Sequence, residues 1–579
     1  MKNTLVFFKK YIPIILVIIA VLFGQAMCEL SLPGYLSDII NKGIVKQDQS
    51  YIYHAGIIMV CVAAGSMIFA VLASAFASRV SGGSSRDIRA ALFKRVTAFS
   101  TAEMNQFSTA SLITRSTNDV QMIQQASVMI LRMACYAPIL GVGALIKALH
   151  TSTSLTWTIA LALGIILCMM IVMFLLVMPK FKVLQKLLDK LNLIVGERLS
   201  GLLVVRAFNS EAVEEERFDK TNKLLTKINT FVNRGMSFMF PFLMFIMNLT
   251  SVGVVWFGSK LINTQDLLIG DMLAFIQYSM QIIMSFLIIT IMFIMIPRAA
   301  VSAQRIGAVL AIEPSINDKV DAQKIESPKG SVEFKNVSFA YPHADENTLS
   351  NISFTAKPGQ TTAIIGGTGS GKSSLISLIP RFFDVTSGSI NIDGKDVREI
   401  PQNDLRDHIG YVPQKGVLFS GTISSNLAYG KDNATEEEML DAAEIAQALP
   451  FIKALPKSLD TEVSQGGTTV SGGQKQRLSI ARALIKKPEI YIFDDSFSAL
   501  DFKTDATIRK SLKEKTGGST FIIVAQRINT IMDADQIIVL DEGQISGIGT
   551  HHELLNSCQV YNEIAKSQLS EKELGRENA

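Results

Sequence analysis

Long runs of apolar residues, interrupted by few charges, dominate the first half of the chain. Four of these runs cover roughly residues 55–77, 155–178, 236–257 and 272–297. Each is close to the ~20 residues that an α-helix needs to cross a bilayer. The pattern therefore predicts membrane-spanning helices in this half of the chain.

The chain starts with a basic segment that contains Lys2, Lys9 and Lys10, and an apolar run follows over residues 11–27. This combination resembles a secretory signal peptide. However, no small-x-small cleavage site follows the run, and Cys28 lacks the small residue that should precede a lipoprotein cysteine. We therefore interpret the run as an uncleaved first span.

The weakest candidate span lies between Arg132 and Lys147, where the uncharged run is short. We include it because about six spans place both ends of the membrane region on the same side. Loop charge sets the orientation, since segments 79–132 and 180–234 are rich in lysine and arginine and the other connections are poor in both. By the positive-inside rule these two segments, the N-terminus and everything after Arg298 are predicted to be cytoplasmic. Their helical composition predicts that the spans continue into the cytoplasm as long helices.

The apolar runs end at Pro297, and a soluble pattern takes over. Residues 313–330 form a charged, proline-containing connector, which we predict to be a linker. Beyond it, short apolar strands such as 361–365 and 490–493 alternate with helical stretches. The sequence thus predicts an α-helical transmembrane domain of about six spans over residues 1–312, followed by the linker and an α/β domain over residues 331–579.

Composition supports a membrane region joined to a water-soluble part. The chain has 579 residues, too many for one core, of which 48% are hydrophobic and 18% charged. The net charge is only +4 and no concentrated basic stripe is present, so no nucleic-acid partner is predicted. The five cysteines are scattered without a C-x-x-C pair, which predicts neither a disulfide framework nor a metal site.

The strongest chemical signal is the segment 366–373, G-G-T-G-S-G-K-S, which fills the phosphate-binding pattern G-x-x-x-x-G-K-[ST] between a predicted strand and a predicted helix. Glycines let the backbone aim N–H groups at phosphate oxygens, Lys372 would reach the β- and γ-phosphates, and the Ser373 hydroxyl would hold Mg²⁺. The alternative is a glycine-rich turn that binds nothing, which the complete pattern disfavours. The predicted phosphate-binding residues are Gly366, Gly367, Thr368, Gly369, Ser370, Gly371, Lys372, Ser373 and Ser374.

Further motifs follow this loop in a fixed order. They are Y-V-P-Q at 411–414, V-S-G-G-Q at 470–474, I-Y-I-F-D-D at 490–495, S-A-L-D at 498–501 and V-A-Q-R at 524–527. Their order resembles the ATP-binding cassette, for which S-G-G-Q between a P-loop and an apolar strand ending in aspartate is highly specific. With spans first and cassette second, the whole chain resembles a half-transporter of the type IV ABC exporter fold. Segments 107–120 and 197–211 resemble the two intracellular coupling regions of that family.

The resemblance implies a role for each matching residue, with ATP and Mg²⁺ as cofactors. Tyr341 would stack on adenine, Gln414 would sense Mg²⁺ and the γ-phosphate, and Asp494 would hold the Mg²⁺ shell. One cassette of this family supplies half of each of two ATP sites, so a dimer is implied. The signature residues, which would cap an ATP bound to the opposite subunit, are Ser471, Gly472, Gly473 and Gln474.

Two catalytic positions depart from the family pattern. Where the family has a glutamate that polarises the attacking water, this chain has Asp495, which is one methylene shorter. Withdrawing a base by about an ångström can cost on the order of a hundredfold in rate. The family's switch histidine is replaced by Gln526, which cannot carry a positive charge to the γ-phosphate. His551 and His552 lie well downstream of that position and are expected on the surface.

These coincident changes predict an asymmetric machine. The chain's own site should bind nucleotide and hydrolyse it slowly, while its intact signature completes a competent site on a different subunit. A homodimer that is merely slow is the alternative. A third departure, S-Q at 464–465 where related exporters tend to have G-E, affects the loop that communicates with the coupling regions.

The spans contain little ionic chemistry. Glu29 and Asp271 are expected at the membrane interfaces, so no charged pocket is predicted in mid-membrane. Methionines recur in the fifth and sixth spans, where flexible thioethers can repack around differently shaped apolar guests, although packing or lipid contact suits any single one. With the resemblance, they favour multidrug-type efflux of hydrophobic or amphipathic compounds across the cell membrane. The alternatives are a lipid or lipopeptide flippase and, from another class, an ATP-gated channel or regulatory subunit.

Overall fold

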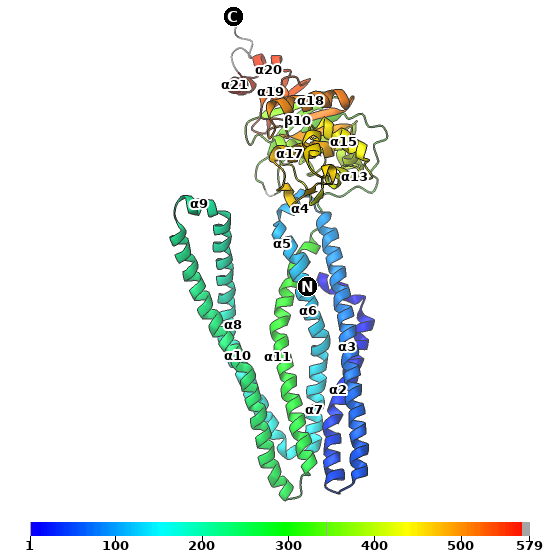
Figure 1. Ribbon diagram of the computed structural model, residues 1–579, viewed down its shortest axis with the longest axis vertical. Helices are drawn as coiled ribbons and strands as arrows, with labels where there is room; N and C mark the ends of the chain where they lie inside the picture. The colour runs from blue at the N-terminus through cyan, green and yellow to red at the C-terminus, as the bar shows by residue number, and fades with distance from the viewer. Residues whose placement is uncertain (1, 343, 570–579) are drawn as a thin grey trace. The chain divides into compact units, whose positions relative to one another are not determined.

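The computed structural model describes residues 2–342 and 344–569, and the chain divides into two compact units (Figure 1). Met1–Thr97 and Thr109–Ile312 form one unit, which we call the transmembrane unit. Ala98–Ser108 and Glu313–Ala579 form the other, the cassette unit. The short helix α4 (Thr101–Asn105) thus belongs to the cassette unit although both flanking helices belong to the transmembrane unit.

Within the described residues, six helical stretches are long and apolar enough to cross a membrane, which confirms the predicted six-span region. They are Ile12–Ile44, Gln49–Thr97, Thr109–Thr151, Thr153–Val177, Glu211–Asn263 and Ile269–Ala311. The elements of this unit are α1 (Lys2–Lys9), α2 (Ile12–Asp38), η1 (Ile39–Ile44), α3 (Gln49–Thr97), α5 (Thr109–Thr114), η2 (Arg115–Asp119), α6 (Val120–Met129), η3 (Ile130–Ala134), α7 (Cys135–Thr151), η4 (Thr153–Leu155), α8 (Thr156–Ser200), α9 (Leu202–Ala207), α10 (Glu211–Asn263) and α11 (Ile269–Ala311).

The third span, the weakest in the sequence, is present as α7 with its preceding π-helical turn η3. Small residues explain its position. A Cβ added at Gly143 would lie 2.3 Å from the side chain of Leu30, and one added at Gly141 would lie 2.4 Å from Ser285 Oγ. These glycines allow α7 to pack closely against α2 and α11, as small residues do between membrane helices.

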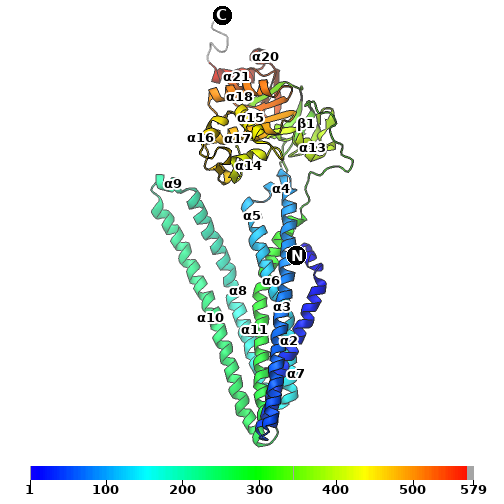
Figure 2. The same cartoon turned by 45° about the vertical axis from the view of Figure 1, so that its right-hand side comes forward.

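The predicted cytoplasmic extensions of the spans are also present. α3 has 49 residues and α10 has 53. At 1.5 Å per residue each is at least about 70 Å long, more than twice the ~30 Å hydrocarbon core of a bilayer. Figure 2 shows α8 and α10 running side by side to the turn that holds α9.

Glu29, predicted at a membrane interface, lies within the helical stretch that forms the first span. The first span continues without a break from Ile12 to Ile44, so Glu29 lies near its middle. Its carboxylate accepts hydrogen bonds from Tyr136 on α7 and from Ser66 on α3. Two of the groups that satisfy this carboxylate thus come from helices that are distant in the sequence. Asp271, by contrast, lies in the first turn of α11.

Three sheets organise the cassette unit. The largest has the order β12-β11-β3-β10-β9-β6, in which all pairs are parallel except β11 with β12. A four-stranded antiparallel sheet has the order β2-β1-β4-β5, and β7 pairs with β8. The strands are β1 (Val332–Phe339), β2 (Leu349–Ala356), β3 (Thr361–Gly366), β4 (Ser387–Ile392), β5 (Lys395–Asp396), β6 (Ile409–Val412), β7 (Gly421–Thr422), β8 (Glu462–Val463), β9 (Ile490–Asp494), β10 (Thr520–Val524), β11 (Gln536–Asp541) and β12 (Gln544–Gly549).

Helices cover both faces of the six-stranded sheet. Alternate residues of its strands point to different cores: Ala363 and Ile365 of β3 belong to one apolar cluster and Ile364 to the other. This double burial explains the continuous apolar strands of the sequence. The helices are α12 (Lys372–Ser377), α13 (Gln402–Asp407), α14 (Ile423–Ala428), α15 (Glu436–Ile445), α16 (Leu449–Ala454), α17 (Gly472–Ile485), α18 (Phe502–Lys515), α19 (Ile528–Ile531), α20 (His551–Ser557) and α21 (Gln559–Gln568), with 3₁₀ turns η5 (Val397–Glu399), η6 (Ser458–Asp460) and η7 (Gln465–Gly467).

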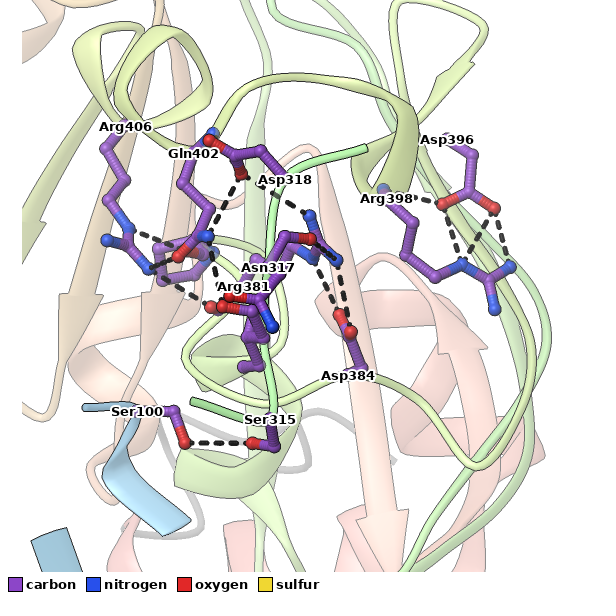
Figure 3. Close-up of polar contacts among 12 residues, drawn as sticks. Ser100, Ser315, Asn317, Asp318, Arg381, Asp384, Asp396, Arg398, Gln402 and Arg406 are labelled. Carbon is purple, nitrogen blue, oxygen red and sulfur yellow. Dashed lines mark hydrogen bonds and ion pairs between the residues drawn. The ribbon is translucent and has the colours of Figure 1, made fainter. Parts of the chain in front are cut away.

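The connector and α4 are fixed to each other inside the cassette unit. The hydroxyls of Ser100 and Ser315 lie 3.2 Å apart (Figure 3). Glu103 accepts a hydrogen bond from the Ser315 N–H at 3.3 Å, and Ala102 packs against the apolar cluster beneath. The segment that holds α4 therefore contacts the start of the connector, which follows α11.

A cluster around Arg381 holds the next part of the connector (Figure 3). The Arg381 guanidinium donates to both carboxylate oxygens of Asp384, at 2.7 and 3.2 Å, and to the Asn317 carbonyl at 3.4 Å. The carboxylate of Asp318 accepts from the backbone and side-chain amides of Gln402, at 3.1 and 3.0 Å. The start of the predicted linker is thus bound to the cassette surface.

Candidate nucleotide-binding site

The predicted phosphate loop connects the carboxyl end of β3 to α12. Gly369 and Gly371 have φ values of +85° and +94°, a left-handed conformation that glycine adopts without strain. Gly366 has no room for a side chain, because a Cβ would lie 2.1 Å from the Leu540 carbonyl oxygen of β11. The glycines therefore form a tight turn of the kind that surrounds a phosphate with backbone N–H groups.

Lys372 lies over this loop. Its ammonium donates to the carbonyls of Gly366 and Gly367, at 2.9 and 2.6 Å, and to Ser370 Oγ at 3.3 Å. Burial lowers the pKa of Lys372, and the nearby carboxylates of Asp495 and Asp494 oppose this shift. All three contacts are to neutral oxygens, so negatively charged phosphate oxygens would compete for the same ammonium.

Ser373 and Asp494, two of the predicted metal-binding residues, lie together. Ser373 is in the first turn of α12, and its Oγ donates to Asp494 Oδ1, at the end of β9, over 2.9 Å. Asp494 is only 6% exposed, and burial raises its pKa, while the Ser373 hydrogen bond lowers it. Gln414, the third predicted member, contacts the neighbouring Asp495 instead.

Two glutamines hold the carboxylate of Asp495. Its Oδ2 accepts from Gln526 Nε2 at 3.0 Å and from Gln414 Nε2 at 3.3 Å. Asp495 is 7% exposed and has a φ of +46°. Burial raises its pKa, and the Gln414 hydrogen bond opposes that shift. Both residues predicted to be catalytic, Asp495 and Gln526, are thus in direct contact in what we call the carboxylate corner, defined by Asp495, Gln526 and Gln414.

A residue that sequence reasoning missed fixes the backbone of this corner. Gln568, at the end of α21, donates from Nε2 to the Gln526 carbonyl at 2.9 Å and accepts from the Ile528 N–H at 2.8 Å. One side-chain amide therefore satisfies the carbonyl of the switch position and the N–H two residues beyond it. No spacing rule connects residues that are 42 positions apart, so the sequence offered no signal for this contact.

The helix pair α20–α21 that carries Gln568 contains a buried histidine. The prediction that His551 lies on the surface is wrong, because it is only 5% exposed and its Nδ1 lies 2.7 Å from the Tyr561 hydroxyl. His552, next to it, is exposed as expected. The pattern misled because only one side of this helix faces the core.

Tyr341 lies at the rim of the phosphate loop. Its hydroxyl is 2.8 Å from Ser374 Oγ, and its ring packs edge-on against Phe339 and Phe383, with centroids 4.9 and 5.3 Å away. The side chain is 37% exposed, so part of it is open to solvent. The structure therefore places Tyr341, the predicted adenine contact, at the rim of the phosphate loop.

The signature residues lie at the N-terminus of the 14-residue helix α17. Ser471 Oγ accepts from the Gln474 N–H at 3.3 Å, and Gln474 Oε1 accepts from the Ser471 N–H at 2.9 Å. This reciprocal capping box fixes the end of the helix. Ser471 and Gly472 are exposed, whereas Gly473 is half-buried. The signature thus presents an ordered and accessible helix end.

The divergent loop before the signature is closed by its own side chains. Ser464 Oγ lies 2.7 Å from Thr468 Oγ1 and accepts from the Thr469 N–H at 3.2 Å. The serine that replaces glycine at this position therefore makes a local turn.

Two family descriptions match the chain. The family described as ABC transporter transmembrane region matches residues 14–286, and the family described as ABC transporter matches residues 349–498. The chain is also similar to a solved bacterial Atm1-family ABC exporter with ATP bound, with 26% identity, a TM-score of 0.81, and coverage of 96% of this chain and 98% of that one.

Several relatives match the chain over nearly their whole length. An uncharacterized ABC transporter ATP-binding protein of Mycobacterium tuberculosis is 40% identical, with 94% of each chain covered. Another from Bacillus subtilis is 38% identical over 98% of this chain and 99% of its own length. An ATP-dependent lipid A-core flippase of Haemophilus influenzae is 32% identical over 95% of this chain and 94% of its own.

Proposed function

The chain belongs to the ABC exporter family, as a half-transporter that joins a multi-pass transmembrane region to a cytoplasmic ATP-binding cassette, and on that basis we propose what it exports and how. It moves hydrophobic or amphipathic compounds of the multidrug type out of the cell. Half-transporters act as dimers, and this one pairs with a different subunit. Its own ATP site is degenerate, and its signature completes the partner's competent site.

The carboxylate corner carries the proposal. Oδ2 of Asp495 already accepts hydrogen bonds from two neutral amides, those of Gln526 and Gln414, at 3.0 and 3.3 Å. An oxygen that is engaged in this way is less able to take a proton from water. The side chain is also one methylene shorter than glutamate. Gln526 adds no positive charge for the developing γ-phosphate charge, so this corner is suited to holding nucleotide more than to hydrolysing it.

The rest of the site supports nucleotide binding. Lys372, Ser373 and the glycine turn have the geometry of a phosphate cradle, and Tyr341 offers a partly exposed ring at its rim. The exposed helix end at Ser471 is available to an ATP held by a partner. The catalytic side chains are altered, whereas the phosphate loop and the signature are retained. This combination favours a dimer with two unequal ATP sites.

Mg²⁺ fits the residues that are present. Ser373 Oγ and Asp494 Oδ1 lie 2.9 Å apart beside the loop, and hydroxyl and carboxylate oxygens are ligands that Mg²⁺ prefers. These two residues would hold the ion together with phosphate oxygens. When bound, the ion would neutralise charge on the β- and γ-phosphates.

In the proposed cycle, closure of two cassettes around two ATP molecules turns the cavity between the transmembrane regions outward. Hydrolysis at the partner's competent site, capped by Ser471 of this chain, resets the dimer. ATP held at Lys372 acts mainly as a clamp, because its tighter binding to the closed dimer shifts the population toward that state.

The ATPase rate of defined assemblies tests this proposal. The chain purified alone should hydrolyse ATP slowly, and Asp495→Ala should change that rate little. Its complex with a half-transporter that carries glutamate and histidine at the two altered positions should be fast, and Ser471→Ala in this chain should strongly reduce the rate. Brisk hydrolysis by the chain alone that Asp495→Ala abolishes would overturn the proposal.

Lipid flipping is the second candidate function. It is favoured by the lipid A-core flippases among the relatives, which are 32–33% identical to this chain. Proteoliposomes separate the two candidates: ATP-dependent uptake of amphipathic dyes indicates drug export, whereas ATP-dependent inversion of a labelled lipid without dye uptake indicates a flippase.

A further inference from the structure

Glu29 is a carboxylate that the chain holds inside its membrane-spanning helices. Its Oε1 accepts from Ser66 Oγ on α3 at 3.1 Å and from Gln25 Nε2, one turn earlier on α2, at 3.0 Å. Its Oε2 accepts from the hydroxyl of Tyr136 on α7. The side chain is half-buried, so it remains partly accessible. Three helices thus converge on this one acid.

The charge of Glu29 is not neutralised by the protein. All three donors are neutral groups, and none of the ion pairs within residues 2–342 and 344–569 includes Glu29. Asp119, a buried acid of the same unit, does have a cationic partner, because Arg305 lies 3.3 Å from it. A carboxylate inside a spanning helix is costly unless it is paired, and such groups usually mark a ligand or ion path. This site therefore has one negative charge to offer to a ligand.

A small cavity adjoins α2 at Leu36, which lies about two helical turns beyond Glu29 on the same helix. It has a volume of about 340 Å³ and lies between α2 and α11. Gln281 lines it and donates from Nε2 to the Glu29 carbonyl at 3.2 Å. The Gln281 Oε1 atom is buried and has no hydrogen-bond partner among the described residues. The remaining lining residues are Leu36, Leu273, Ile276, Gln277 and Met280.

One kind of ligand would satisfy both Glu29 and Gln281. Glu29 offers a negative charge without a cation, and Gln281 offers a buried acceptor without a donor. A protonated amine supplies both a positive charge and N–H donors, and the leucine, isoleucine and methionine side chains suit an apolar body attached to it. We propose that Glu29 and Gln281 form a recognition site for the ammonium group of amphipathic organic amines. This inference rests on the export function proposed above and assigns it a substrate class.

The same charge selects against anionic amphiphiles. A phosphate or carboxylate headgroup would meet the Glu29 carboxylate at low dielectric, where like charges repel strongly. The site therefore favours cationic drugs over anionic lipids.

Binding of matched probes to the full chain in phosphatidylcholine nanodiscs tests the inference. The probes are a dansyl-alkylamine, its neutral N-acetyl derivative and its quaternary trimethylammonium derivative. The wild-type chain should bind the amine about tenfold more tightly than the acetyl compound, which corresponds to about 1.4 kcal/mol. The quaternary probe, which keeps the charge but lacks N–H groups, should bind with an intermediate affinity.

Three variants locate the effect. Glu29→Gln should reduce the preference for the amine to less than about twofold while leaving the affinity for the neutral probe unchanged. Gln281→Leu should weaken binding of the amine probe more than binding of the quaternary probe. Asp271→Asn is the matched control, because this second membrane-region carboxylate is held by Ser37 and Asn41 at the start of α11, and it should leave the preference intact. Thermal unfolding of each variant checks that it is folded.

The outcomes separate this inference from the proposed function. An unchanged preference in a folded Glu29→Gln variant, or an equal loss in Asp271→Asn, would overturn the ammonium site. ATP-dependent transport in proteoliposomes is scored independently. If selective binding depends on Glu29 but neither probe is transported, the site stands and the export proposal fails. If both probes are transported with equal efficiency by wild type and Glu29→Gln, export stands and the site fails.

Discussion

The phosphate loop and the carboxylate corner lie at the carboxyl ends of strands of one sheet, yet they are built in different ways. Every contact of the Lys372 ammonium is to the loop that immediately precedes it, within six residues. Asp495, in contrast, is held by Gln414 and Gln526, which are 81 and 31 positions away. Gln526 in turn is fixed by Gln568, a further 42 positions along the chain.

This difference separates binding from catalysis. A phosphate cradle made from one short segment persists as long as that segment does. A catalytic corner assembled from four distant segments can be altered by one substitution in any of them. A site built in this way should lose hydrolysis more readily than ATP binding, and the following variants test each half of the comparison.

The largest effect is expected from removing the cation of the loop. Lys372→Ala should weaken ATP binding about 1,000-fold, or about 4 kcal/mol, because the only charged group of the loop is lost. Fluorescence titration with a labelled ATP analogue measures the affinity. Lys357→Ala is the control, since this lysine is exposed and lies just before the same strand. Equal loss in both variants would contradict a local cradle.

Rebuilding the corner should produce a smaller gain. The double variant Asp495→Glu/Gln526→His restores the reach of the base and a chargeable group at the γ-phosphate. Its ATPase rate should rise by about tenfold to a hundredfold over the chain as it stands, while the KM for ATP stays within about twofold. Steady-state kinetics of the purified chain provide both values. A rate that does not change would show that the two substitutions do not limit hydrolysis.

The same contrast explains what the sequence could predict. The loop, the six spans and the α/β cassette follow from local patterns: a glycine motif, apolar runs and buried strands. The third span was weak because charges at Arg132 and Lys147 leave only a short uncharged run. The signature and the unusual positions Asp495 and Gln526 were identified by the resemblance to the ABC family.

Contacts between distant side chains could not be predicted in this way. Hydropathy identified Glu29 only as the end of an apolar run, although Ser66 and Tyr136 from other helices satisfy it inside the first span. His551 looked like a surface residue for the same reason, because its partner Tyr561 becomes a neighbour only when α20 packs on α21. Gln568 carried no signal at all, since its role depends on where the switch loop folds.

Gln568 allows a test of how far the corner depends on distant segments. Gln568→Ala, placed in the Asp495→Glu/Gln526→His background, removes two hydrogen bonds to the backbone around the switch position. At about 1 kcal/mol for each, or about 2 kcal/mol together, kcat should fall by about thirtyfold, and KM should change little because the loop is untouched. Gln559→Ala, on the same helix and exposed, is the control. A parallel rise in KM would point to general unfolding of the cassette instead of a positioning role.

The smallest effect is a dependence of stability on pH at the helix pair that carries Gln568. Burial lowers the pKa of His551, and the neighbouring His552 lowers it further, while Asp533 opposes this. The unfolded chain therefore takes up a proton at the ordinary histidine pKa of about 6.5, but the folded chain does so only at a lower pH. The stability contributed by neutral His551 is present above about pH 6.5 and is lost as the pH falls below it. Between pH 7.5 and pH 5.5, the melting temperature of the wild type should fall by about 2 °C more than that of His551→Gln, whereas His552→Gln, which removes only the smaller of the two lowering causes, should keep most of the wild-type dependence. Differential scanning fluorimetry at fixed ionic strength measures this difference. If His551→Gln shows the same acid dependence as the wild type, another group controls it, and the carboxylate corner is not linked to pH through its supporting helices.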